Sequence, residues 1–366
     1  MNSLNDSMKR PVHGSITPAE LRELGLNIDD VIDFSSNINP LGMSAYLKAA
    51  MSDVDISRYP DPECLELREA LSKGTGLDIA SIIVGNGSTE LIHLIARAFL
   101  NRNSAAVILS PTYGEYETAC RLAGVEPVFI KSEEAHGFRW NIASVCKQIK
   151  SIAPRIAFLC NPNNPTGVLL KSSDVVKIAA SAAPGLLIVD EAYMPFADDP
   201  WDATTLLDRG NIVVMRSMTK DYAVAGIRLG YIAATADVIE RLKSYQPFWS
   251  VNAIAQALGL AAINDNKHIA KARKTVAEAR SYLLKSIEDM GLDVIPSSTN
   301  FLLIKVGNAK SMRQALLRQG ICVRDCTSFG LPQYIRIAMQ PMTECRKFID
   351  GLKAAAKSIA KESTYR

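Results

Sequence analysis

The sequence lacks the features that mark metal, disulfide and membrane proteins. Four histidines and seven scattered cysteines form no C-x-x-C pair, so no zinc site and no disulfide framework can be assembled by spacing. No apolar run approaches the roughly 18 residues that a membrane helix needs, and the nearest, Ala253–Ile263, is too short. We therefore expect a soluble, cytoplasmic protein with reduced thiols, no metal and no membrane partner.

The chain also has little excess charge. Lysines and arginines number 41 against 38 acidic residues, which leaves a net charge of +3 over 366 residues. This balance does not predict nucleic-acid binding. The polar first ten residues lack the apolar stretch of a signal peptide. With 48% hydrophobic residues, the chain can bury a sizeable core, and its length suits two domains.

Short apolar strands alternate with amphipathic helical stretches through the middle of the chain. The predicted strands are Ile82–Val84, Ala105–Leu109, Pro127–Ile130, Ile156–Cys160, Leu186–Asp190, Ile212–Arg216 and Leu229–Ala233. Continuous apolar strands with helices between them predict an α/β fold with a mostly parallel seven-stranded sheet covered on both faces. Helices would include Thr89–Leu100 and Asp174–Ala182.

The pattern changes after residue 252. A helical region to about Met290 is followed by strands at Phe301–Val306, Ile321–Arg324 and Tyr334–Met339, a helix at Ser311–Gln319 and a last helix from Thr343. We expect a large domain over 52–252, a smaller α+β domain over 253–366, and a segment 1–51 without a sheet pattern that packs with the smaller domain. A ligand site would lie at the carboxyl ends of the central strands, between the domains.

Lys220 follows a predicted buried strand in the run Arg216-Ser217-Met218-Thr219-Lys220. A partly desolvated lysine with cations nearby has a lowered pKa and can form an imine with an aldehyde. Ser217 and Arg228 would then bind a phosphate. Taken alone, a surface lysine at a strand end is the more common explanation.

Asp190 ends another apolar strand and is followed by Glu191-Ala192-Tyr193. A buried carboxylate needs a partner, and the protonated ring nitrogen of pyridoxal 5'-phosphate (PLP) is one. Tyr193 would hydrogen-bond the phenolic oxygen of that ring. Taken alone, Asp190 is more simply explained as a helix cap.

Three further segments lie at predicted strand ends. Asn161–Gly167 (NPNNPTG) forms a rigid turn that offers Asn164 to the ring oxygen. In Gly85–Glu90 (GNGSTE), small residues and hydroxyls at a helix start predict an anion site, although a simple N-cap is compatible with the same residues. Tyr113 would stack on the ring, and Tyr59 would reach the cofactor phosphate across a dimer interface; ordinary packing is the plain alternative for Tyr113.

Taken together, the motifs GNGSTE, PTYGEY, NPNNPTG, DEAY, SMTK and GIRLGY resemble, in order and spacing, those of aspartate-aminotransferase-like PLP enzymes. The resemblance covers essentially the whole chain. It implies PLP as cofactor, a homodimer, and Lys220, Asp190 and Tyr193 as catalytic residues. The cofactor-binding residues it implies are Gly87, Ser88, Thr89, Tyr113, Asn164, Asp190, Tyr193, Ser217, Lys220, Arg228 and Tyr59.

Two subfamilies share these motifs: histidinol-phosphate aminotransferases and threonine-phosphate decarboxylases. Further segments resemble the decarboxylases, namely His13-Gly14, Asp33–Gly42, Gln246–Asn252, Gly320–Cys326 and Tyr334–Ala338. The resemblance implies a small phosphorylated amino acid as substrate, bound by Arg336, Arg324, Asn39 and His13. Decarboxylation of L-threonine O-3-phosphate is therefore the leading hypothesis, and histidinol-phosphate amino transfer the alternative. A non-catalytic PLP-fold binding protein is a remote third.

Overall fold

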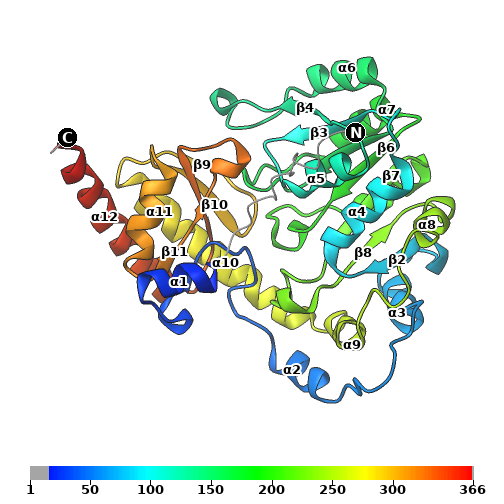
Figure 1. The fold of residues 1–366 in the computed structure, drawn as a ribbon, viewed down its shortest axis with the longest axis horizontal. Coiled ribbons are helices and arrows are strands. Elements are labelled where there is room, and N and C mark those ends of the chain that lie inside the picture. The colour runs from blue at the N-terminus through cyan, green and yellow to red at the C-terminus, as the bar shows by residue number, and fades with distance from the viewer. Residues whose placement is uncertain (1–15, 365–366) are drawn as a thin grey trace, which may run out of the picture.

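The computed structural model describes residues 16–364, and a seven-stranded sheet forms its centre (Figure 1). The strand order is β2-β8-β7-β6-β5-β3-β4, with β8 antiparallel to both neighbours and the other pairs parallel. The bounds are β2 Ile82–Gly85, β3 Ala106–Ser110, β4 Val128–Lys131, β5 Ile156–Cys160, β6 Leu186–Asp190, β7 Ile212–Ser217 and β8 Gly230–Ala233. All seven predicted strands are confirmed to within a residue or two at each end.

Helices cover both faces of this sheet because alternate residues of each strand point to opposite sides. Ile108 packs with α4 (Gly87–Phe99), α5 (Glu115–Leu122) and α8 (Ala236–Lys243) on one face. Its neighbours Val107 and Leu109 pack with α6 (Ile142–Ile152) and α7 (Ser172–Ala182) on the other. The predicted α/β architecture with two covered faces is therefore observed.

A smaller four-stranded sheet, in the order β12-β13-β10-β9, forms the second unit. Its strands are β9 Val294–Ile295, β10 Phe301–Lys305, β12 Arg324–Asp325 and β13 Tyr334–Ala338, all paired antiparallel. Helices α10 (Asn266–Glu288), α11 (Ala309–Leu317) and α12 (Met342–Thr364) pack with one face of this sheet in a core of their own. On its other face, Ile295, Leu303 and Tyr334 pack with a core of the large sheet. Seven short 3-10 helices complete the described residues: η1 Ile28–Asp30, η2 Ile79–Ser81, η3 Glu134–His136, η4 Met194–Phe196, η5 Ala203–Arg209, η6 Ala225–Ile227 and η7 Thr327–Phe329.

Two expectations about the strands need correction. The single strand expected at 321–324 is divided, because β11 (Ile321–Cys322) pairs with β1 while β12 pairs with β13 in another sheet. The segment before residue 52 does carry a strand, β1 (Ile32–Asp33), which lies parallel to β11. An isolated two-residue strand has no periodicity to detect, so its pairing partner is needed to reveal it.

The helices near the predicted domain boundaries pack together on one edge of the large sheet. Leu47 of α2 (Ala45–Ser52), Leu67 of α3 (Leu65–Thr75) and Leu258 of α9 (Ala253–Ala262) share one core with Ile82 of β2. In contrast, α1 (Pro18–Leu24) lies beside β11 and the smaller unit, where Glu20 pairs with Arg313 (Figure 1). The division into 1–51, 52–252 and 253–366 stays a prediction, and this packing places α2 and α9 with the large sheet.

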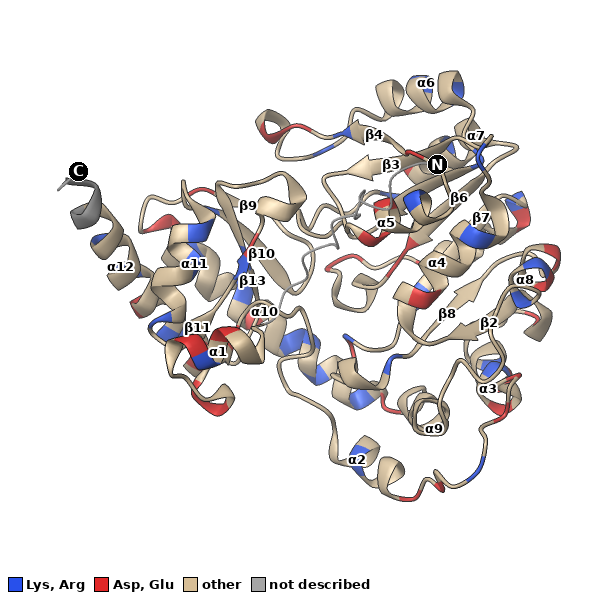
Figure 2. Ribbon diagram, viewed as in Figure 1, with Lys and Arg blue, Asp and Glu red and all other residues tan. Residues whose placement is uncertain are grey.

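Acidic and basic residues are interspersed over most elements (Figure 2). No helix within residues 16–364 is both long enough and apolar enough to cross a bilayer.

Candidate active site

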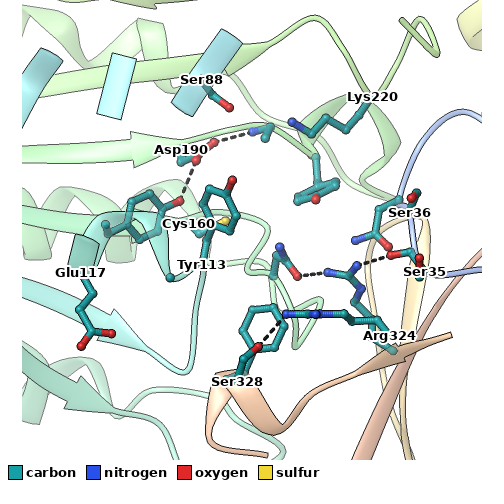
Figure 3. Close-up of a pocket in the computed structure, with 18 of the residues that line it drawn as sticks. Ser35, Ser36, Ser88, Tyr113, Glu117, Cys160, Asp190, Lys220, Arg324 and Ser328 are labelled. Carbon is teal, nitrogen blue, oxygen red and sulfur yellow. Dashed lines mark hydrogen bonds between the residues drawn. The ribbon is translucent and has the colours of Figure 1, made fainter. Parts of the chain in front are cut away.

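A cavity of about 400 Å³ lies where the large sheet, the smaller sheet and the N-terminal segment meet (Figure 3). It opens at the carboxyl ends of the parallel strands, the position expected for a ligand in an open α/β sheet. Its lining includes eight of the predicted site residues: Ser88, Tyr113, Asn164, Asp190, Tyr193, Lys220, Arg324 and Arg336.

Lys220 lies three residues beyond β7, and its amine points into the cavity opposite Asp190 (Figure 3). Its Nζ donates a hydrogen bond of 3.0 Å to Ser217 Oγ, which is also 2.8 Å from Thr219 Oγ1. Burial lowers the pKa of the Lys220 amine, and the nearby Arg228 cation lowers it further, while Asp190 opposes the change. A lowered pKa increases the fraction of neutral amine, which is the form that attacks an aldehyde.

Asp190 is buried at the end of β6, and both of its oxygens accept hydrogen bonds. Tyr116 donates from its hydroxyl to Oδ2 at 2.7 Å, and the Ala192 N–H donates to Oδ1 at 3.0 Å. Burial raises the pKa of Asp190, and the Tyr116 hydrogen bond opposes that rise by stabilising the carboxylate. Tyr116 was not singled out from the sequence, although its place three residues after Tyr113 puts it one helical turn along.

An anion cradle is built where α4 begins. The N-terminus of α4 has no side-chain cap, so its first N–H groups are available to a ligand. Gly87 has φ +78°, and a Cβ there would lie 2.7 Å from the Arg228 guanidinium, so both the backbone angle and the space require glycine. A Cβ on Gly230 would similarly lie 3.1 Å from the Ser88 nitrogen. The cradle thus combines a helix start with a guanidinium, as phosphate binding requires.

Aromatic and amide groups line the space between this cradle and the smaller sheet. Tyr113 lies edge-on to Tyr116, with ring centroids 5.8 Å apart, and its hydroxyl is 3.5 Å from Thr89 Oγ1. Tyr193 packs edge-on against Phe301 at 5.1 Å, and burial raises the pKa of its hydroxyl. Asn164 Oδ1 accepts a hydrogen bond from Arg336, so the NPNNPTG turn joins the two walls of the cavity.

Two arginines face the cavity from the smaller sheet, directly opposite each other in the register of β12 and β13. Arg336 donates to the Ser35 carbonyl at 2.6 Å, and Arg324 donates to Ser328 Oγ at 2.6 Å. Burial, followed by the charge of Arg336, lowers the pKa of Arg324 to about 10. Two adjacent guanidiniums that line one cavity form a site suited to anions.

Asn37 is a cavity residue that the sequence analysis missed. Its side chain is 95% buried and lies close to Tyr193, yet neither its Nδ2 nor its Oδ1 has a hydrogen-bond partner of acceptable geometry among the described residues. The Nε of Arg336 is likewise buried, with no hydrogen-bond partner within the part of the chain that the structure describes. Buried polar atoms are normally satisfied, so these atoms indicate where a ligand would bind.

Two of the predicted residues, Asn39 and Tyr59, are not among the residues that line the cavity. Asn39 was expected at the substrate, but its amide donates to the Asp221 carbonyl at 2.8 Å and accepts from the Leu41 N–H at 2.9 Å. Its backbone N–H also donates to the Lys220 carbonyl at 2.7 Å, so Asn39 supports the lysine loop and does not line the cavity. Tyr59 is 80% exposed and stacks on Trp249. His13 lies outside the described residues.

The residues present fit PLP. The cavity offers an amine of lowered pKa, a buried carboxylate and a cradle for a phosphate, which are the groups that its aldehyde, ring nitrogen and phosphate need. The fold and the site together define a PLP-dependent enzyme.

The chain belongs to the aminotransferase class I and II family, whose model matches residues 29–352. It is 35% identical over 355 residues to a histidinol-phosphate aminotransferase of Symbiobacterium thermophilum, covering 95% of this chain and 96% of that one. It is 37% identical over 335 residues to a protein of Caldanaerobacter subterraneus that is provisionally named a threonine-phosphate decarboxylase, covering 87% and 88%. The predicted family and cofactor are confirmed.

The fold is also that of a solved structure, the histidinol-phosphate aminotransferase of Sinorhizobium meliloti in complex with PLP. The TM-score is 0.86 at 24% identity, over 94% of this chain and 96% of that one. The aspartate-aminotransferase-like fold predicted from the motifs is thereby confirmed.

Proposed function

We propose that this enzyme decarboxylates L-threonine O-3-phosphate to (R)-1-amino-2-propanol O-2-phosphate, a step in making the cobalamin side chain. The observation that carries the choice of substrate is the set of decarboxylase-like segments in the sequence, and one of the relatives described above supports it. This substrate carries two anionic groups, a carboxylate and a phosphate. The guanidiniums of Arg324 and Arg336, which face one cavity with Lys220, suit such a substrate.

The geometry at the strand ends of the large sheet supports a cofactor end made of these residues. Lys220 would join PLP, Asp190 would pair with its ring nitrogen, and Tyr193 and Asn164 would hydrogen-bond its ring oxygen. Gly87, Ser88, Thr89, Ser217 and Arg228 would bind its phosphate, and Tyr113 would contact its ring. When bound, PLP withdraws electrons from the Cα of the attached amino acid.

At the substrate end, Arg336 would bind the carboxylate and Arg324 the phosphate. The placement of these two anionic groups would decide which bond at Cα breaks. If the carboxylate leaves as carbon dioxide, the Lys220 ammonium would supply the proton that takes its place on Cα.

Histidinol-phosphate amino transfer is the second candidate, because another of the relatives described above carries that name. The same residues would serve it, with the neutral Lys220 amine removing the proton from Cα. The two arginines do not separate the candidates, since 2-oxoglutarate, the second substrate of that reaction, also carries two anionic groups.

The test is a pair of reactions with purified, PLP-loaded protein. One holds L-threonine O-3-phosphate, and the other holds histidinol phosphate with 2-oxoglutarate. Carbon dioxide and aminopropanol phosphate in the first, lost in Lys220→Ala, would support the decarboxylase. Glutamate in the second reaction alone would overturn it in favour of the aminotransferase, and no turnover in either would reject both substrates.

We also propose a homodimer. Tyr59 and Phe248 are 80% and 75% exposed, and Trp249, which contacts both, is 47% exposed. Such a cluster of large aromatic rings is typical of a protein interface. Light scattering would give twice the chain mass for the native protein, and Tyr59→Asp with Phe248→Asp would shift it toward one chain mass. A single chain mass for the native protein would reject the dimer.

A further inference from the structure

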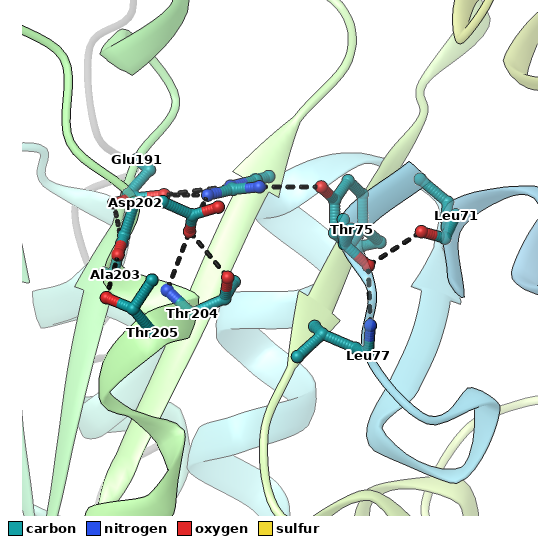
Figure 4. A network of polar contacts seen from close by, with 10 residues as sticks. Leu71, Thr75, Leu77, Glu191, Asp202, Ala203, Thr204 and Thr205 are labelled. Atoms are coloured by element: carbon teal, nitrogen blue, oxygen red, sulfur yellow. Dashed lines mark hydrogen bonds and ion pairs between the residues drawn. The ribbon is translucent and has the colours of Figure 1, made fainter. Parts of the chain in front are cut away.

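One guanidinium ties together three strand ends behind the cofactor site. Arg216 donates from Nε to Glu191 Oε2 at 2.9 Å, and its Nη2 lies 2.8 Å from the same oxygen. Its Nη1 donates to the Tyr231 hydroxyl at 3.2 Å, and its Nη2 also reaches Asp202 at 2.5 Å. Figure 4 shows the Glu191 and Asp202 carboxylates converging on this group.

Arg216 and two of its partners, Glu191 and Tyr231, are each the sequence neighbour of a residue in the proposed cofactor site. Arg216 precedes Ser217 on β7, and Glu191 follows Asp190 at the end of β6. Tyr231 follows Gly230, whose backbone approaches the Ser88 nitrogen. Because side chains alternate along a strand, the Arg216 cluster lies on the face opposite Ser217 and Asp190.

The register places these ends side by side. Arg216 is paired with Tyr231 and Ser217 with Gly230 across β7 and β8, while the Glu191 N–H donates to the Met215 carbonyl at 2.8 Å. The guanidinium therefore spans the same three strand ends that present the carboxylate, the hydroxyl and the cradle to the cofactor.

The ion pair between Arg216 and Glu191 lies mostly away from solvent. The Glu191 side chain is fully buried, and its second oxygen accepts from the Ala203 N–H at 3.2 Å. Breaking a buried ion pair from one side leaves a charge without compensation, so the pair holds its geometry firmly. The five donors of a guanidinium form a rigid fork, which a lysine cannot reproduce.

We propose that Arg216 is a positioning residue for PLP: by binding Glu191 and Tyr231, it fixes the spacing between Asp190, Ser217 and the phosphate cradle. The inference concerns cofactor binding and does not depend on which substrate is used. Arg216 touches neither cofactor nor substrate, and it acts through the residues beside it.

The test uses a double variant, Glu191→Gln with Arg216→Met, which leaves no buried Glu191 carboxylate without its cation. The single variants Arg216→Lys, Arg216→Met and Glu191→Gln are compared with it. Three quantities are measured: the PLP dissociation constant, the pH midpoint of the visible band of lysine-bound PLP, and the urea midpoint of the apoprotein. The control is Arg68→Met. Arg68 is also buried, but its donors go to the Ile79 and Ile82 carbonyls at the far end of β2.

We expect the double variant and Arg216→Met to bind PLP roughly 10- to 100-fold more weakly and to shift the pH midpoint, since a small misplacement of a site residue has a large effect. Arg216→Lys, which keeps the charge but not the fork, should lie between these variants and wild type. Arg68→Met should lower the urea midpoint and leave both PLP measurements unchanged. An unchanged affinity and pH midpoint in the folded double variant, or the same PLP defect in Arg68→Met, would overturn the proposal.

Discussion

The two walls of the cavity differ in how many hydrogen bonds their buried polar groups make with the protein itself. On the wall formed by the large sheet, Asp190 is bonded to Tyr116 and Ala192, and Lys220 to Ser217. On the wall formed by residues 35–38 and the smaller sheet, both polar atoms of Asn37 and the Nε of Arg336 are buried without a hydrogen bond of acceptable geometry to any described residue. We therefore propose that the first wall is preorganised for the cofactor and that the substrate completes the second.

The largest expected effect comes from removing the central group of the preorganised wall. Lys220→Ala should lower turnover roughly 10³- to 10⁴-fold, because the amine both joins the cofactor and moves the proton at Cα. The visible band of lysine-bound PLP should disappear, and borohydride should no longer fix PLP to the protein. Persistence of the fixed label on another residue would show that Lys220 has been assigned wrongly.

The next effect tests the opposite wall. Arg336→Gln removes a buried cation that would bind the substrate carboxylate, so kcat/KM should fall roughly 100-fold, as expected for loss of a charge-assisted hydrogen bond. PLP affinity should stay within about twofold, since the cofactor is held by the other wall. Arg318→Gln, at an exposed position in the same unit, serves as the control. A larger loss in PLP affinity than in substrate binding would break the distinction between the walls.

The buried Asp221 carboxyl, next to Lys220, makes the free energy of unfolding depend on pH. Burial raises the pKa of Asp221 to about 7 from its usual 3.8, so the fold favours the protonated carboxyl. The stability that this proton contributes is fully present below pH 4 and is lost as the pH rises through 7. The free energy of unfolding of Asp221→Asn, taken relative to wild type, should therefore rise by about 2 kcal/mol as the pH goes from 5 to 7.5. Urea unfolding of the two apoproteins measures the gain, with Asp202→Asn as the matched variant whose carboxylate pKa is lowered. A constant difference between wild type and Asp221→Asn across this range would contradict the expectation.

A smaller effect is expected at Asn37. Asn37→Ala should raise KM about tenfold with little change in PLP affinity, because a neutral amide contributes roughly 1 kcal/mol to binding. Steady-state kinetics with the natural substrate measure this change, and Asn308→Ala, at a helix cap in the smaller unit, controls for general destabilisation. An unchanged KM would mean that the unpaired amide does not contact the substrate.

The smallest effect is expected at Tyr116. Tyr116→Phe removes one donor from a carboxylate that keeps the Ala192 N–H, so PLP affinity should fall only about five- to tenfold. The pH midpoint of the visible band should shift, because the pKa of Asp190 rises when the donor is lost. Absorbance titration measures both, and an unchanged spectrum at all pH values would show that Tyr116 serves packing alone.

The difference between the walls also explains what the sequence reveals. Lys220, Asp190 and Asn164 each follow a buried strand within a compact motif, so their place in the fold could be predicted, whereas their roles stay a proposal. Asn37 and the two arginines come from segments about 290 residues apart, and no local pattern brings such segments together. The contact of Asn39 with Asp221 could not be predicted for the same reason, since Asp221 lies 182 residues further along the chain.

The pairing of β1 with β11 also sets an order of assembly. Phe34 is held on both sides by backbone groups of Cys322 and Ala338, so the segment that carries Asn37 has no binding place until those residues exist. During synthesis, the strands of the large sheet, which end at residue 233, emerge first. The cofactor wall is therefore complete in the nascent chain earlier than the substrate wall, and a chain that stops short of residue 338 would lack the second wall.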